Sequence, residues 1–84
     1  MKPARTWQAI LGGNRNIRFD DAVRLAEAFG FSTRRIRGSH HIMLHSDLPA
    51  ALNLQPDRNG NAKPYQLRQL VDLVEIHGLK LEEP

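Results

Sequence analysis

Residues 32–45 read STRRIRGSHHIMLH, and this stretch decides the fold. Two short segments, 32–37 and 41–45, flank a Gly-Ser pair of the kind that forms a two-residue turn between antiparallel strands. The pattern therefore predicts a β-hairpin. In such a hairpin the residues that border the turn, Arg37 and His40, lie opposite each other on one face of the sheet.

Two helices and a third strand are predicted outward from the hairpin. Apolar residues recur at helical spacing over 19–29 and predict a helix that Gly30 ends. The same spacing predicts a second helix that starts at Pro64 and ends at Gly78. Between them, residues 51–55 alternate apolar and polar side chains, as a strand with one wet face does. The expected order is α-β-β-β-α, an α+β fold in which a three-stranded antiparallel sheet packs one face on two helices. Which face of the hairpin is buried stays open, because its apolar residues point both ways.

Residues 1–18 precede this core and are predicted to be an N-terminal extension, with the main domain over 19–84. Apolar side chains of Trp7, Ile10 and Leu11 could line a short helix, which Gly12 and Gly13 would end. The extension is interpreted either as an added helix or as part of a contact with a partner protein.

Composition narrows the class of protein. With 84 residues, 40% of them hydrophobic and 25% charged, the chain is expected to form one soluble globular domain. It has no cysteine, which excludes disulfides and a thiol nucleophile, and no apolar run approaches the roughly 20 residues of a membrane span, so we expect a cytoplasmic protein. The net charge is +3, and five arginines fall between Arg18 and Gly38, which favours phosphate-bearing partners. A soluble surface that merely happens to be basic explains the charge equally well, so the position of the arginines must decide between the two.

The hairpin turn carries the candidate chemistry. Cleavage of RNA without a metal needs a base for the 2′-OH proton, an acid for the leaving 5′-oxygen and positive charge near the phosphate. His40 is the candidate catalytic residue, although a histidine after a turn is more often a plain surface residue. Arg35 and Arg37 precede the turn, and Lys63 precedes the second helix, so these three are candidate phosphate-binding residues.

Other sites are less well supported by the pattern. His40, His41 and His45 suggest a metal site, but adjacent strand residues point to opposite faces and no carboxylate lies between these histidines, so we expect no metal and no cofactor. Tyr65 could stack on a base, but packing at the helix start is the commoner arrangement. About 30 residues with strand character separate the two helices, which argues against a helix-turn-helix DNA-binding protein.

Several short motifs stand at fixed spacing over roughly 18–79: Gly30-Phe31, Arg35, Arg37, Gly38-Ser39-His40-His41-Ile42, Lys63-Pro64, Leu67-Arg68 and Gly78-Leu79. Together they resemble the HicA toxins of bacterial toxin-antitoxin systems. It implies a fold similar to the double-stranded-RNA-binding domain, with 19–84 as a HicA-like toxin domain. It also implies an mRNA interferase activity, with His40 as the functional histidine and a HicB antitoxin as partner.

The sequence departs from this family at two places. Gln55, Pro56 and Asp57 stand where many relatives carry a second histidine, and Tyr65-Gln66 replaces a frequent Gly-Thr. The departures leave the general acid open.

The expected function is therefore that of a toxin and endoribonuclease acting on mRNA, with no membrane or small-molecule cofactor as partner. The resemblance and the turn together assign RNA contacts to Arg35, Arg37, Gly38, Ser39, His41 and Lys63. The alternative is a non-catalytic RNA-binding module of the same fold, which would recognise A-form shape without cutting.

Overall fold

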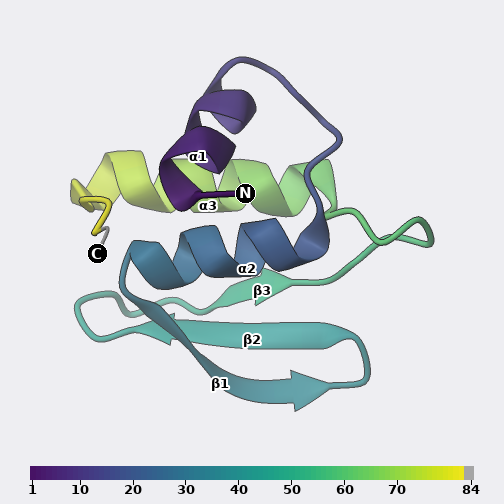
Figure 1. The fold of residues 1–84 in the computed structure, drawn as a ribbon. Coiled ribbons are helices and arrows are strands. Elements are labelled where there is room, and N and C mark those ends of the chain that lie inside the picture. The colour runs from purple at the N-terminus through teal and green to yellow at the C-terminus, as the bar shows by residue number, and fades with distance from the viewer. Residues whose placement is uncertain (83–84) are drawn as a thin grey trace.

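A computed structural model describes residues 1–82 of the chain, and the predicted α-β-β-β-α order is confirmed in it with one further helix in front (Figure 1). The elements are α1 (Pro3–Leu11), α2 (Phe19–Ala28), β1 (Phe31–Arg37), β2 (His40–His45), β3 (Leu52–Leu54) and α3 (Pro64–His77). The first and second strands each begin one residue earlier than predicted, and the third is shorter than the predicted 51–55.

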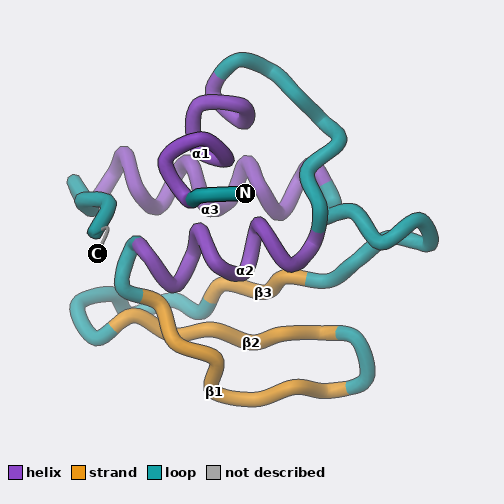
Figure 2. The backbone as a smooth tube through the Cα atoms, in the orientation of Figure 1, coloured by secondary structure: helices purple, strands orange, loops and turns teal. Residues whose placement is uncertain are grey.

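The elements form a sheet and a helical layer. The sheet has three antiparallel strands in the order β1-β2-β3. Helices α2 and α3 cover one of its faces, and α1 lies across them on the side away from β1 and β2 (Figures 1 and 2). The other face of the sheet, called the outer face below, carries no helix (Figure 1).

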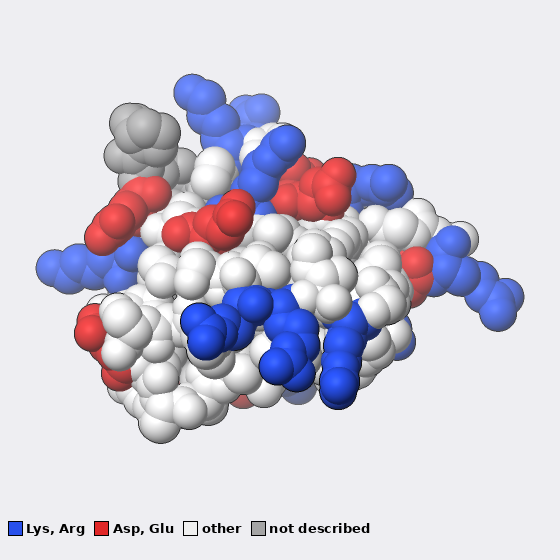
Figure 3. Space-filling view, turned by 90° about the horizontal axis from the view of Figure 1, so that it is seen from below, with Lys and Arg blue, Asp and Glu red and all other residues white. Residues whose placement is uncertain are grey.

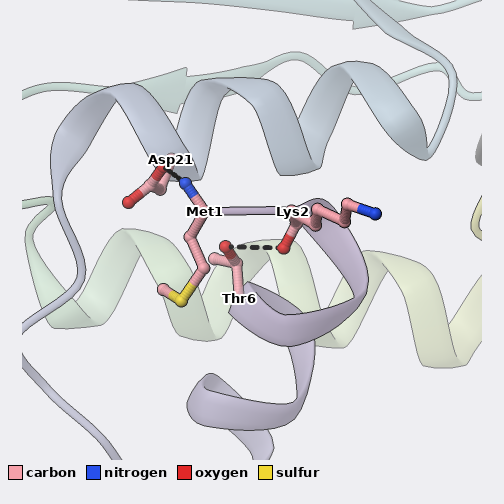
Figure 4. Close-up of polar contacts among 4 residues, drawn as sticks. All are labelled: Met1, Lys2, Thr6 and Asp21. Carbon is pink, nitrogen blue, oxygen red and sulfur yellow. Dashed lines mark hydrogen bonds and ion pairs between the residues drawn. The ribbon is translucent and has the colours of Figure 1, made fainter.

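The extension forms the predicted short helix α1, which is tied to α2. Pro3 starts the helix, and the Gly12 backbone N–H donates to the Gln8 carbonyl at its end, 2.9 Å away. The Met1 amino group lies 3.0 Å from a carboxylate oxygen of Asp21 on α2 (Figure 4). Within α1, the buried Thr6 hydroxyl donates to the Lys2 carbonyl at 3.3 Å (Figure 4).

The hydrophobic core lies between the sheet and the helices. The Trp7 ring of α1 meets the Phe29 ring edge-on, with 4.9 Å between ring centroids, so the extension packs onto the core. The buried apolar residues are Ile17, Ala22, Leu25, Ala26, Phe29, Phe31, Met43, Leu52, Leu54, Ala62, Leu67, Leu70 and Val74.

The register of the hairpin settles which of its faces is buried. Met43 is completely buried, so its row of β2 faces the helices, and that row includes His41 and His45. The alternate row, with His40, therefore lies on the outer face. The register between β1 and β2 shifts after Thr33, which places one residue of β1, Arg34, in a bulge.

A tight turn at Gly30 joins α2 to β1. Gly30 has a φ of +100°, and a Cβ there would come within 2.7 Å of His45 Nε2. The His45 Nδ1 accepts a hydrogen bond from the Asp47 backbone N–H at 3.0 Å, and its ring packs edge-on against Phe31. The imidazole thus fills the space that a side chain at position 30 would need.

Candidate functional site

The turn between β1 and β2 has the two-residue form that the sequence predicts. Gly38 has a φ of +57°, whereas no non-glycine residue among 1–82 has a positive φ. This is the pattern of a type II′ turn with Ser39 in second place. Both turn residues are exposed, and a Cβ built on Gly38 would meet nothing within 4 Å. A ligand can therefore reach the turn without displacing other side chains.

Arg37 and His40 are direct partners across the hairpin, as the sequence predicts. They lie on the outer face, with Arg37 exposed and His40 half-buried. Within residues 1–82 no hydrogen bond or ion pair engages the His40 imidazole or the Arg37 guanidinium. Both groups are consequently available to a ligand.

A row of arginines follows the free edge of the sheet. Arg34, Arg35 and Arg37 of β1, called the arginine edge below, are all exposed. No Asp or Glu occurs in β1 or β2, and the one ion pair of the described chain joins Met1 to Asp21. Figure 3 shows basic side chains lined up on this side of the molecule. Arg34 was not among the predicted RNA-binding residues, although the Arg34-Arg35 doublet was a signal for it.

His41 lies on the other face of the sheet from His40. It faces the helices, and its ring meets the Phe19 ring edge-on with 4.9 Å between centroids. Its Nδ1 is buried and has no hydrogen-bond partner among the residues the structure describes. The structure does not bring His41 together with His40, and its RNA contact stays a prediction.

Lys63 immediately precedes α3 and is half-buried. The start of α3 lies in the helical layer, apart from the hairpin turn in Figure 1. There the buried Gln66 accepts a hydrogen bond from the Gln55 backbone N–H at 2.8 Å, which ties α3 to the end of β3. The structure therefore gathers His40, the arginine edge and the turn at one end of the sheet, while Lys63 lies elsewhere.

Tyr65 differs from its expectation. Packing of Tyr65 at the helix start was predicted, but the residue is 65% exposed, so that prediction was wrong. The backbone reason is that the second helical position of α3 points away from the core, whereas the neighbouring Gln66 points into it.

Two features are absent from residues 1–82. No three His, Asp or Glu side chains in this part of the chain lie close enough together to hold a metal ion. None of its helices combines the length and the apolar character that crossing a membrane requires.

A family model described as the HicA toxin of bacterial toxin-antitoxin systems matches residues 19–78, which include α2, the whole sheet and α3. No curated protein and no solved structure matches the chain.

Proposed function

Because this chain belongs to the HicA toxin family, we propose that it is an endoribonuclease that cleaves mRNA with His40 at the reacting centre. Family membership makes the chain the toxin of a toxin-antitoxin system, with a cognate antitoxin as its partner. The observation that carries the nuclease proposal is the unengaged imidazole of His40, directly opposite Arg37 on the open face of the sheet.

The proposed reaction is an internal transfer at a ribose. His40 accepts the proton of the 2′-OH, and the 2′-oxygen attacks the adjacent phosphorus while the bond to the 5′-oxygen breaks. The products are a 2′,3′-cyclic phosphate and a free 5′-OH. The Arg37 guanidinium stabilises the negative charge that builds up on the phosphate oxygens. Solvent supplies the proton for the leaving oxygen, because β1, β2 and β3 carry no carboxyl group and His40 is the one histidine on their outer face.

RNA binding in this proposal uses the arginine edge and the turn. Arg34, Arg35 and Arg37 contact successive phosphates along β1, and the exposed Gly38 and Ser39 admit the backbone of the RNA close to His40. The antitoxin is proposed to be HicB-like and to shield His40, and mRNA as substrate places the activity in the cytoplasm.

The first test follows growth and mRNA integrity in cells that express the wild type, His40→Ala or His77→Ala. His77 is an exposed histidine at the end of α3 and serves as the matched control. Loss of a general base lowers the rate by roughly 10²- to 10⁴-fold, so His40→Ala should leave growth and transcripts intact while the control stays toxic. Equal toxicity of the wild type and His40→Ala would refute the catalytic assignment.

A second test uses purified protein and a short RNA. A single 2′-deoxy substitution at the cut site should abolish cleavage there, because the attacking hydroxyl is missing. RNA that is bound by both wild type and His40→Ala but cut by neither would identify a non-catalytic RNA-binding module. Cleavage that a chelator abolishes would point to a metal-dependent reaction instead.

A further inference from the structure

A groove of about 490 Å³ opens between α3 and the segment that ends α1. Ile10 of α1 and Leu67 and Val71 of α3 contribute aliphatic side chains to its lining. Two large apolar side chains beside them reach into solvent: Leu11 is 56% exposed and Tyr65 is 65% exposed. Neighbouring exposed apolar groups around a concave surface are typical of a protein-binding site.

The charge at the groove is of one sign. Arg15 and Arg68 both line it, both are exposed, and neither has a hydrogen bond or an ion pair within the described chain. No Asp or Glu is among the lining residues. The groove is therefore complementary to a ligand that combines apolar groups with negative charge.

We propose that this groove receives an acidic segment of the cognate antitoxin. Aliphatic or aromatic side chains of that segment fill the space over Ile10 and Leu67, and its carboxylates pair with Arg15 and Arg68. The aliphatic lining favours a peptide over RNA, because bases stack on aromatic rings and Tyr65 is the one ring in the groove. The proposal rests on the chain being a toxin with an antitoxin, and it does not depend on the nuclease activity.

The groove and the His40 site lie on different sides of the molecule. α1 lies on the side of the helical layer away from the sheet, whereas His40 lies on the outer face (Figure 1). The residues of one wall, which are Ile10, Leu11, Gly13, Asn14 and Arg15, also precede the 19–78 region that matches the family model. A contact in the groove binds the antitoxin partly through the N-terminal extension, which lies outside the matched region. Such a contact helps the toxin to distinguish its own antitoxin from others.

The test measures the affinity of the full-length chain for its purified cognate antitoxin by isothermal titration calorimetry. The double variant Arg15→Glu/Arg68→Glu reverses both groove charges, and Arg5→Glu/Arg24→Glu reverses two exposed arginines outside the groove as a matched control. We expect the groove variant to bind at least about tenfold more weakly, because each reversed charge meets a carboxylate, and the control to bind within about twofold of wild type.

A separate variant and a second ligand complete the test. Leu11→Ser removes an exposed apolar contact without changing charge, and it should also weaken antitoxin binding by about tenfold. Each variant is checked by its thermal midpoint and by its affinity for an RNA oligonucleotide, which should match wild type.

Antitoxin affinity that is unchanged in both groove variants would overturn the proposal, and a loss of RNA affinity alone would assign the groove to RNA. A failure of the nuclease proposal is distinguishable, since it appears in His40→Ala and leaves these affinities unaffected.

Discussion

Replacing the arginine edge with glutamines should change how strongly RNA binding depends on salt. Arg34, Arg35 and Arg37 are exposed and make no ion pair within residues 1–82, so each is free to neutralise one phosphate. For single strands, each neutralised phosphate contributes about −0.7 to the slope of log K against log salt, so three contribute about −2. These contacts alone should weaken wild-type binding roughly 20-fold between 50 and 200 mM salt, and the triple variant should lose that part of the dependence.

The assay is fluorescence anisotropy of a labelled RNA made uncleavable by 2′-deoxy substitution, titrated at several salt concentrations. Arg35→Gln alone should flatten the slope by about 0.7, whereas Arg24→Gln, which removes an exposed arginine of α2, should leave it unchanged. A triple variant with the wild-type slope would refute the reasoning. So would an equal flattening by Arg24→Gln, because the effect would then reflect net charge and not a site on β1.

Three further predictions concern the scaffold, each checked by urea unfolding followed by circular dichroism. Gly30→Ala should lower the free energy of unfolding by about 3 to 5 kcal/mol, because it strains the backbone and displaces the His45 imidazole. Gly13 has a φ of +91° and no atom near the position of a Cβ, so Gly13→Ala should cost only the backbone strain, about 1 to 3 kcal/mol. Equal losses in the two variants would contradict the clash with His45. Gln66→Leu leaves the Gln55 N–H without its acceptor and should cost about 1 to 3 kcal/mol, whereas Gln66→Glu should cost less. Met43→Ala empties a fully buried position and should cost about 2 to 5 kcal/mol, and a loss below 1 would show that the site collapses.

Local signals in the sequence were enough to predict the elements and the turn. Glycines and prolines mark the ends of the helices, since Pro64 starts α3 and Gly78, with a φ of +61°, follows its last residue. The Gly-Ser pair fixes the hairpin turn, and the turn length alone puts Arg37 opposite His40. The helix ends and the hairpin turn each depend on a few neighbouring residues, so they could be predicted from the sequence alone.

Features that depend on packing between distant segments were not predictable. The buried face of the hairpin is chosen by the helices, which bury Met43 and leave Leu44 40% exposed, although both are good strand residues. The bulge at Arg34 has no local marker in the sequence. Tyr65 is exposed because α3 places the neighbouring Gln66 in the interior, where Gln66 accepts a hydrogen bond from the Gln55 backbone N–H after β3.

The edge position of β1 has a consequence for the toxin as a free protein. An edge strand of seven residues offers unpaired N–H and C=O groups to any other extended chain, and two copies of the toxin could add to each other there. Three like charges and a bulge on that strand oppose such self-association. The residues that would bind RNA thus also oppose pairing between two copies at this edge. A mutation that removes these arginines is therefore expected to weaken RNA binding and also to make the toxin more prone to aggregate.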